Sequence, residues 1–319
     1  MKPLIAVLGA TATGKSALGI ALAERFRGEI INCDSTAVYR GFDIGTDKVP
    51  LAERRGIPHH LIDIADPTSE YTAAQFARDA TAVIRDIHAR GAVPILVGGT
   101  GFYYRALTRG LFPGPAADAP LRARLEAIAD RRGVEHLHRL VARVDSGSAA
   151  RIMPRDLKRM VRALEVYFLT GRPLTAHFEA TASLLDADVQ VIPIGLRMPA
   201  AWLSDRLTRR VDAQFDAGLL AEVRGLLAAG VPASARPFGG LVYRQAMEHL
   251  RGVRDERETR ALIAQENRRY ARRQLIWFRK EPNLVWFDGP GTNAEVQDSV
   301  IRELTARGLL KDGKNVAAT

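Results

Sequence analysis

The sequence lacks several features that would each indicate a class of protein. Its 319 residues include one cysteine, Cys33, so an intramolecular disulfide is excluded and a reducing compartment is expected. No stretch approaches the roughly 18 apolar residues that a membrane-spanning helix needs. No cluster of Cys and His has the spacing of a zinc site. We therefore expect a cytoplasmic protein that does not act with a membrane.

The composition suits a globular chain with a sizeable core, since 47% of the residues are apolar and 26% are charged. The formal net charge is +10, and an excess of positive charge raises the local concentration of polyanionic partners. Charge alone leaves two interpretations open. The partner is a nucleic acid, or the surface is simply basic.

The first 110 residues alternate strands with helices. Continuous apolar runs predict buried strands over 4–8, 29–33 and 92–97, and helical spacing predicts helices over 16–26 and 71–90. Strands separated by helices indicate βαβ units and a parallel sheet covered on both faces. The predicted fold class is therefore α/β.

A Pro-rich and Ala-rich stretch at 111–120 looks like a linker, and only helical patterns follow it as far as residue 185. The expected helices there cover 121–131, 134–144 and 155–170. Later elements are a strand over 189–196, two long helices over 199–229 and 256–280, a strand over 284–287 and a helix near 293–307. This order predicts a core domain formed by 1–112 and 187–319, with an all-helical domain inserted at 113–186.

The strongest local motif lies between the first strand and the first helix. It matches G-x-x-x-x-G-K-[ST], the phosphate loop, in the context that the mechanism requires. Its backbone N–H groups and the helix N-terminus attract phosphate, Lys15 adds a full charge, and Ser16 can bind Mg²⁺. The loop predicts a site for a diphosphate or a triphosphate, formed by Gly9, Ala10, Thr11, Ala12, Thr13, Gly14, Lys15 and Ser16.

Two polar residues follow the later strands. Val97 leads into Gly-Gly-Thr-Gly, where a motor ATPase would usually carry an acid for Mg²⁺. The acid is instead Asp34, after the second strand. Ligands of open α/β sheets bind at the carboxyl ends of strands, so Asp34 and Thr100 should lie near the phosphates. Asp34 suits a general base, although a turn-capping role for Asp34 and a turn hydroxyl for Thr100 stay open.

Several motifs together resemble the tRNA dimethylallyltransferase family, also called tRNA isopentenyltransferases. They span nearly the whole chain in order, so the resemblance is specific. The motifs are GATATGKS at 9–16, DSTAVYRGFDIGTDKVP at 34–50, GIPHHLID at 56–63, VGGTGFYYRAL at 97–107, RALEVYFLTGRP at 162–173, VYRQ at 242–245 and RRYARRQLIWFR at 268–279.

The resemblance implies a P-loop NTPase-like core and a nucleotide-binding transferase that modifies tRNA with a prenyl group. Dimethylallyl diphosphate would sit in the loop, and the exocyclic amine of an adenosine next to the anticodon would attack its allylic carbon. Asp34 would be the base, Thr100 a donor to the bridging oxygen, and Mg²⁺ would bind Ser16. Arg210 resembles the family's additional phosphate-binding arginine.

The expected RNA surface is basic. Segment 251–280 holds ten Lys and Arg against four Asp and Glu, and Arg268, Arg269, Arg272 and Arg273 recur at helical spacing. Arg272 and Arg273 are assigned to the diphosphate, or alternatively to tRNA phosphates. We expect a monomer that binds the tRNA anticodon stem-loop through Asp34, Ser35, Thr36, Ala37, Thr100, Arg122, Lys158, Arg159, Met160, Val161, Arg162, Tyr243, Arg244 and Gln245.

Other functions compete with this one. A small-molecule kinase could carry the same loop and acid, and an adenylate isopentenyltransferase would use a free nucleotide. A regulatory RNA-binding protein could keep a relict loop. The helical insertion and the basic residues favour tRNA over a metabolite. A relict loop is disfavoured because the expected functional residues are intact: Lys15, Ser16, Asp34 and Thr100.

Overall fold

The computed structural model describes residues 1–112 and 114–309; residue 113 and residues 310–319, which belong to the predicted domains, lie outside the described part. The chain divides into two compact units. The first comprises Met1–Thr108 together with Leu185–Thr319, and the second is Arg109–Leu184. The second unit begins four residues before the predicted insertion and ends two residues before its predicted end.

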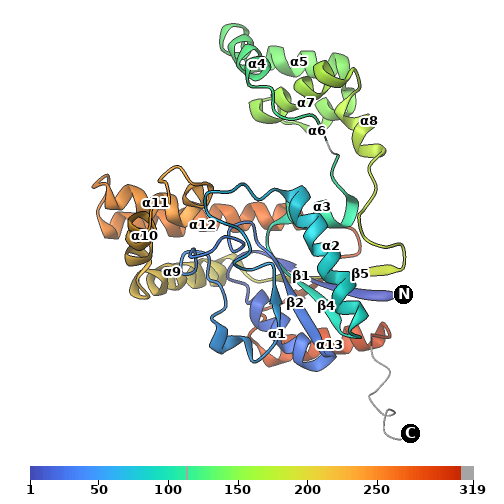
Figure 1. The fold of residues 1–319 in the computed structure, drawn as a ribbon, viewed down its shortest axis with the longest axis vertical. Helices are drawn as coiled ribbons and strands as arrows, with labels where there is room; N and C mark the ends of the chain where they lie inside the picture. The colour runs from blue at the N-terminus through green and yellow to red at the C-terminus, as the bar shows by residue number, and fades with distance from the viewer. Residues whose placement is uncertain (113, 310–319) are drawn as a thin grey trace, which may run out of the picture. The chain divides into compact units, whose positions relative to one another are not determined.

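The first unit is built on a six-stranded sheet in which every neighbouring pair is parallel (Figure 1). The strand order is β3-β2-β4-β1-β5-β6. The strands are β1 (Lys2–Gly9), β2 (Gly28–Cys33), β3 (His59–His60), β4 (Val93–Gly98), β5 (Val189–Arg197) and β6 (Val285–Asp288). The five predicted strands are confirmed. Sequence patterning missed β3, because two residues are too short to show a period.

Helices cover both faces of this sheet. The connection from β1 to β2 runs toward one edge through α1 (Lys15–Phe26), whereas the connection from β3 to β4 returns toward the other through α2 (Ala73–Ala89). Because parallel crossovers are right-handed, α1 and α2 lie on opposite faces. The C-terminal helix α13 (Ala294–Ala306) shares the core of α1, packing against the apolar side chains of β1, β4 and β5. The expected α/β class is confirmed.

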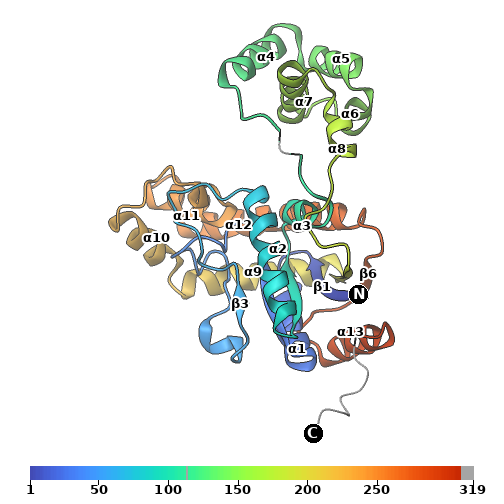
Figure 2. The same ribbon diagram turned by 45° about the vertical axis from the view of Figure 1, so that its right-hand side comes forward.

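Between β5 and β6 the first unit is mainly helical: α9 (Ala200–Asp216), α10 (Leu219–Ala228), α11 (Leu241–Leu250) and α12 (Glu256–Phe278). In both views α9 and α12 lie side by side, and they are in contact (Figures 1 and 2). The prediction of one helix over 199–229 is wrong. Gly218 has φ +96°, a left-handed conformation that ends one helix and starts another. Neither α11 nor α3 (Gly101–Arg109) was expected.

The second unit contains only helices among its described residues: α4 (Ala119–Arg132), α5 (Val134–Val144), α6 (Ser146–Arg151), α7 (Leu157–Thr170) and α8 (Leu174–Glu179). Its core is formed by buried apolar side chains of α4, α5 and α7, including Leu125, Leu137, Val141, Met160 and Leu164. The unit therefore has a hydrophobic core of its own. Across the described residues of the whole chain, no helix is both long and apolar enough to traverse a bilayer.

Candidate functional site

The phosphate loop joins β1 to α1 at the point where the sheet's connections diverge, which is where open α/β sheets bind ligands. Gly9 has φ +142° and Gly14 has φ +83°. A Cβ atom on Gly9 would lie 2.7 Å from the carbonyl oxygen of Leu196, and one on Gly14 would lie 2.9 Å from the backbone nitrogen of Gly291. Both glycines are therefore required by the backbone path and by the close neighbouring chain.

Side chains from distant helices hold the loop in shape. The carboxamide of Gln274 on α12 accepts a hydrogen bond from the Thr11 amide and donates one to the carbonyl of Gly99, both at 2.9 Å. From α9, Arg206 Nε donates to the carbonyl of Ala12 at 2.9 Å, and Arg210 donates to Thr11 Oγ1 at 2.6 Å. Gln274 thus ties the phosphate loop directly to the turn that carries Thr100.

Next to this loop lies a cavity of about 560 Å³. Lys15, Ser16, Asp34, Arg206 and Arg210 all line it. Since Asp34 comes from the end of β2 and the arginines come from α9, the cavity brings together residues that lie far apart in the sequence. The structure thus brings eight of the predicted site residues into one cavity: Thr11, Ala12, Gly14, Lys15, Ser16, Asp34, Ala37 and Arg210.

The ammonium group of Lys15 donates to the carbonyl of Ala10 at 2.7 Å. Burial and then the positive charge of Arg210 lower the pKa of Lys15 to about 8, against the opposing effect of Asp34. Two neighbouring cations disfavour each other's charge. The cavity therefore has an excess of positive charge that an anionic ligand would neutralise.

Asp34 is held by the turn that follows it. Its Oδ1 accepts hydrogen bonds from the Thr36 amide (2.8 Å), the Thr36 hydroxyl (2.7 Å) and the Ala37 amide (3.2 Å). In the described part of the chain its other oxygen, Oδ2, makes no hydrogen bond or ion pair. The turn-capping role and the general-base role are therefore compatible, because each uses a different oxygen.

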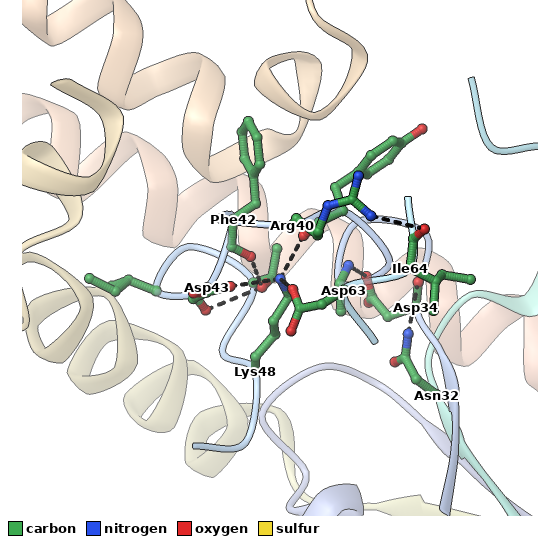
Figure 3. A network of polar contacts seen from close by, with 12 residues as sticks. Asn32, Asp34, Arg40, Phe42, Asp43, Lys48, Asp63 and Ile64 are labelled. Atoms are coloured by element: carbon green, nitrogen blue, oxygen red, sulfur yellow. Dashed lines mark hydrogen bonds and ion pairs between the residues drawn. The ribbon is translucent and has the colours of Figure 1, made fainter. Parts of the chain in front are cut away.

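Lys48 makes hydrogen bonds and ion pairs that hold the loop after Asp34 in place (Figure 3). Its buried ammonium group donates to the Tyr39 carbonyl (2.6 Å) and to the carboxylates of Asp43 (2.7 Å) and Asp63 (2.5 Å). Asn32 adds hydrogen bonds to the carbonyls of Leu61 and Asp34. Lys48 thus joins two points of its own loop to the segment that carries Asp63, and Asn32 joins the same segment to Asp34.

Thr100 is hydrogen-bonded to the residue after Asp34. Its Oγ1 accepts from the Ser35 amide at 3.2 Å, and a threonine hydroxyl that accepts can also donate. Tyr270, which also lines the cavity, shares a side-chain hydrogen bond with Thr100. Burial and then the charge of Asp34 raise the pKa of Tyr270 to about 12, so its phenol stays protonated.

A second hollow of about 370 Å³ adjoins these residues. It is lined by polar groups of the two turns, including Ser35, Thr36 and Thr100, and by aromatic side chains, including Phe102 and Tyr103. Phe102 is 57% exposed, whereas Tyr103 is buried and stacks on Phe76 with ring centroids 4.5 Å apart. Polar groups beside an exposed aromatic ring could hydrogen-bond and stack against a nucleic-acid base that has left its own stack.

Other predicted site residues of the first unit lie elsewhere. Arg272 and Arg273 are exposed and do not line the cavity, where α12 instead presents Tyr270 and Gln274. Tyr243 is 1% exposed, donates to Glu222 at 2.6 Å and accepts from the Gly45 amide. The two arginines assigned to the diphosphate thus lie outside the lining of this cavity, and Tyr243 lies in the core as a support.

The neighbours of Tyr243 are also engaged. Arg244 pairs with Glu266, and the buried Gln245 donates to the same carboxylate at 3.1 Å. Of this predicted trio only Arg244 reaches the surface, where about half of its side chain is exposed. The direct tRNA contacts expected from Tyr243 and Gln245 therefore have no exposed side chain to carry them.

In the helical unit the predicted RNA-binding segment divides in two. Lys158 and Arg159 are exposed, whereas Met160 and Val161 are buried in the core of the unit, so their side chains are not available to tRNA. The division follows from the 3.6-residue period of α7, which turns successive residues toward opposite sides.

Arg122 and Arg162 both bind the fully buried carboxylate of Glu165, at 2.7 and 2.6 Å. Although burial favours the neutral acid, the hydrogen bonds from these two arginines lower the pKa of Glu165 to about 2. Each arginine keeps about a third of its side chain exposed. They hold α4 to α7 and still present positive charge to solvent.

The comparisons with known proteins agree with this geometry. A family model described as IPP transferase matches residues 37–281. The chain belongs to the IPP transferase family. It is 49% identical to a tRNA dimethylallyltransferase of Solibacter usitatus over 94% of this chain and 97% of that one. It is 46% identical to another from Geobacter metallireducens, covering 93% and 96%.

Solved structures of IPP transferases share the fold. The crystal structure of a tRNA isopentenylpyrophosphate transferase from Bacillus halodurans aligns with a TM-score of 0.71 at 37% identity, covering 97% of each chain. A eukaryotic dimethylallyltransferase acting on tRNA aligns with a TM-score of 0.78 at 27% identity, covering 98% of this chain and 82% of that one. The family resemblance seen in the sequence is thereby confirmed.

Proposed function

We propose that this enzyme transfers the dimethylallyl group of dimethylallyl diphosphate to the exocyclic N6 amine of the adenosine 3′ of the anticodon in tRNA, with release of diphosphate. The observation that carries the proposal is the position of Asp34. Asp34 lines the cation-lined cavity, and the next residues, Ser35 and Thr36, line the neighbouring aromatic hollow. A base between a diphosphate site and an adenine site is what an N-alkylation requires.

The reaction balances with these groups. The N6 lone pair forms a bond to the allylic carbon, the carbon–oxygen bond breaks, and its electron pair leaves on diphosphate. Asp34 Oδ2 takes the N6 proton, because an aromatic amine is a poor nucleophile until that proton is lost. Lys15 and Arg210 stabilise the charge that develops on the leaving group, and Thr100 donates to the oxygen that departs.

Magnesium fits the same cavity. The hydroxyl of Ser16 lines it beside Lys15, and hydroxyl and phosphate oxygens are ligands that Mg²⁺ prefers. Among the described residues no three acidic, His or Cys side chains gather into a metal site, so the phosphates would supply most of the ligands. When bound, Mg²⁺ would neutralise charge on the diphosphate.

The acceptor is proposed to be the anticodon stem-loop rather than a free nucleotide. The exposed Arg272 and Arg273 on α12, and Lys158 and Arg159 on the helical unit, offer cations to RNA phosphates. A free adenylate would need none of these positions. We further propose that the protein works as a monomer in the cytoplasm, where unmodified tRNA is found.

The test is incubation of the enzyme with radiolabelled dimethylallyl diphosphate, Mg²⁺ and either unmodified tRNA or AMP. The label should appear in tRNA at the adenosine 3′ of the anticodon, and a tRNA with guanosine at that position should stay unlabelled. Label in AMP but not in tRNA would replace the proposal with an adenylate isopentenyltransferase. Phosphate transfer from ATP to a small alcohol would favour a kinase.

Diphosphate affinity should depend on pH through Lys15. A bound diphosphate favours the charged ammonium, so its pKa rises on binding from about 8. Below pH 8 the ammonium is already present, whereas above it binding must take up a proton. We expect affinity for the donor to fall as the pH rises from 7.5 to 9.5, measured by isothermal titration calorimetry.

The matched control for this pH dependence is Lys15→Arg, whose charge does not titrate in that range. Ionisation of the donor itself affects both proteins equally. The difference between the two pH profiles therefore isolates Lys15. Parallel profiles would contradict the assignment of the lowered pKa to this residue.

A further inference from the structure

A second acid, Asp47, lines the same cavity and contacts α9 rather than the phosphate loop. Its Oδ2 is ion-paired with the guanidinium of Arg210 and also accepts from Gln214 Nε2 at 2.7 Å. Arg210 and Gln214 are one helical turn apart, so both project from the same face of α9. One carboxylate oxygen therefore receives donors from two successive turns of the helix.

The segment that carries Asp47 is held from three helices. Gln214 of α9 also donates to the carbonyl of Gly45, and Glu222 of α10 accepts from the amides of Asp43 and Ile44. Tyr243 of α11 accepts from the amide of Gly45. The carboxylate of Asp47 thus projects from a rigid turn.

Asp47 itself has φ +50°, a left-handed conformation that Asp and Asn adopt more readily than other side chains. Burial raises the pKa of Asp47, and the charge of Arg210 and its hydrogen bond act in the opposite sense. Asp47 therefore stands in an uncommon backbone conformation with Arg210 as its charged partner, while 36% of its side chain stays exposed.

The guanidinium of Arg210 is consequently held at two points. One nitrogen donates to Thr11 Oγ1 in the phosphate loop, the other meets Asp47, and Nε is buried without a partner in the described structure. Arginine has many rotamers, and Arg210 also experiences repulsion from Lys15. An anion is needed to keep the two cations in one cavity before the substrate arrives.

We infer that Asp47 is a positioning residue that aims the guanidinium of Arg210 at the diphosphate. On binding of the donor, Arg210 keeps its bond to Asp47 and exchanges the Thr11 hydroxyl for a phosphate oxygen. Asp47 touches neither the donor nor the adenosine, and it acts only through the arginine. The inference rests on the role of Arg210 in the proposed function.

The first test is Asp47→Asn, which keeps the size, tolerates the left-handed backbone and retains an acceptor for Gln214, but removes the charge. The rate of single-turnover transfer should fall ~10- to 100-fold, since small misplacement of a catalytic group costs that much. KM for tRNA should stay unchanged. Asp216→Asn, at the exposed end of α9, should keep the wild-type rate.

The decisive measurement is a double-mutant cycle. Arg210→Lys should slow transfer by itself, and adding Asp47→Asn to it should change the rate less than about twofold, because coupled residues are not additive. If Asp47→Asn proves unstable in a thermal melt, Asp47→Gly removes the acid while favouring the same backbone conformation. The same rates are then measured on that variant.

The outcomes separate the two proposals. A wild-type rate for Arg210→Lys would overturn the role of Arg210 in the proposed function. A slow Arg210→Lys together with a wild-type rate for Asp47→Asn would overturn the positioning role alone. A full loss from Asp47→Asn in the Arg210→Lys background would also overturn it, since Asp47 would then act independently of the arginine.

Discussion

Replacing Asp34 by asparagine is expected to lower the rate of dimethylallyl transfer by ~10²–10⁴-fold, the usual contribution of a general base. An asparagine keeps the oxygen that accepts from the Thr36 and Ala37 amides, so the turn should persist. It loses the carboxylate oxygen that takes the proton. The rate is measured in single turnovers with radiolabelled donor and saturating tRNA.

The affinity of the Asp34→Asn variant for Mg²⁺ and inorganic diphosphate should stay near that of the wild type, because the cationic groups of the cavity are unchanged. Asp298→Asn, an exposed position on α13, serves as the control and should transfer normally. A wild-type transfer rate in Asp34→Asn would remove the base from the mechanism.

Replacing Lys15 by methionine should be comparably damaging, with a rate loss of ~10²–10³-fold, as when one donor to a developing anion is removed. The ammonium lies at the start of α1, where the helix N-terminus already favours anions. Methionine keeps the length of the side chain but no charge. Diphosphate affinity should fall as well, which calorimetry would show.

Lys2→Met, at the exposed start of β1, removes a positive charge outside the cavity and is the matched control. The variants at Asp34 and at Lys15 should differ in which step they lose. Asp34→Asn should bind diphosphate but transfer the dimethylallyl group slowly, whereas Lys15→Met should lose both diphosphate affinity and transfer rate. A Lys15→Met protein with wild-type diphosphate affinity would show that the loop binds through its backbone alone.

The arrangement of elements was largely predictable. Buried strands such as β1 appear as unbroken apolar runs, and α2 shows its 3.6-residue period. The errors occurred where one left-handed residue ends a helix, as Gly218 does between α9 and α10, and where a strand is as short as β3. A left-handed residue inside an apolar helical pattern has no periodic signature.

The site was predictable only in part. The glycines, Lys15 and Ser16 follow from the chemistry of phosphate binding, and Asp34 follows from the end of a strand. Gln274, Arg206 and Asp47 gave no comparable signal. Their roles depend on contacts with residues that lie far away along the chain, such as Thr11 and Arg210.

The phosphate loop, the parallel sheet, the helical insertion and the family could all be predicted from sequence, because each depends on a local pattern or on motifs that occur in order. Which cations line the cavity depends on how the helices pack. The sequence assigned both Arg210 and the pair Arg272 and Arg273 to phosphate, but of these only Arg210 lines the cavity, because α12 turns Tyr270 and Gln274 toward it and α9 supplies Arg206 and Arg210. A helix presents every side chain in turn, and its packing alone selects the face that meets the ligand.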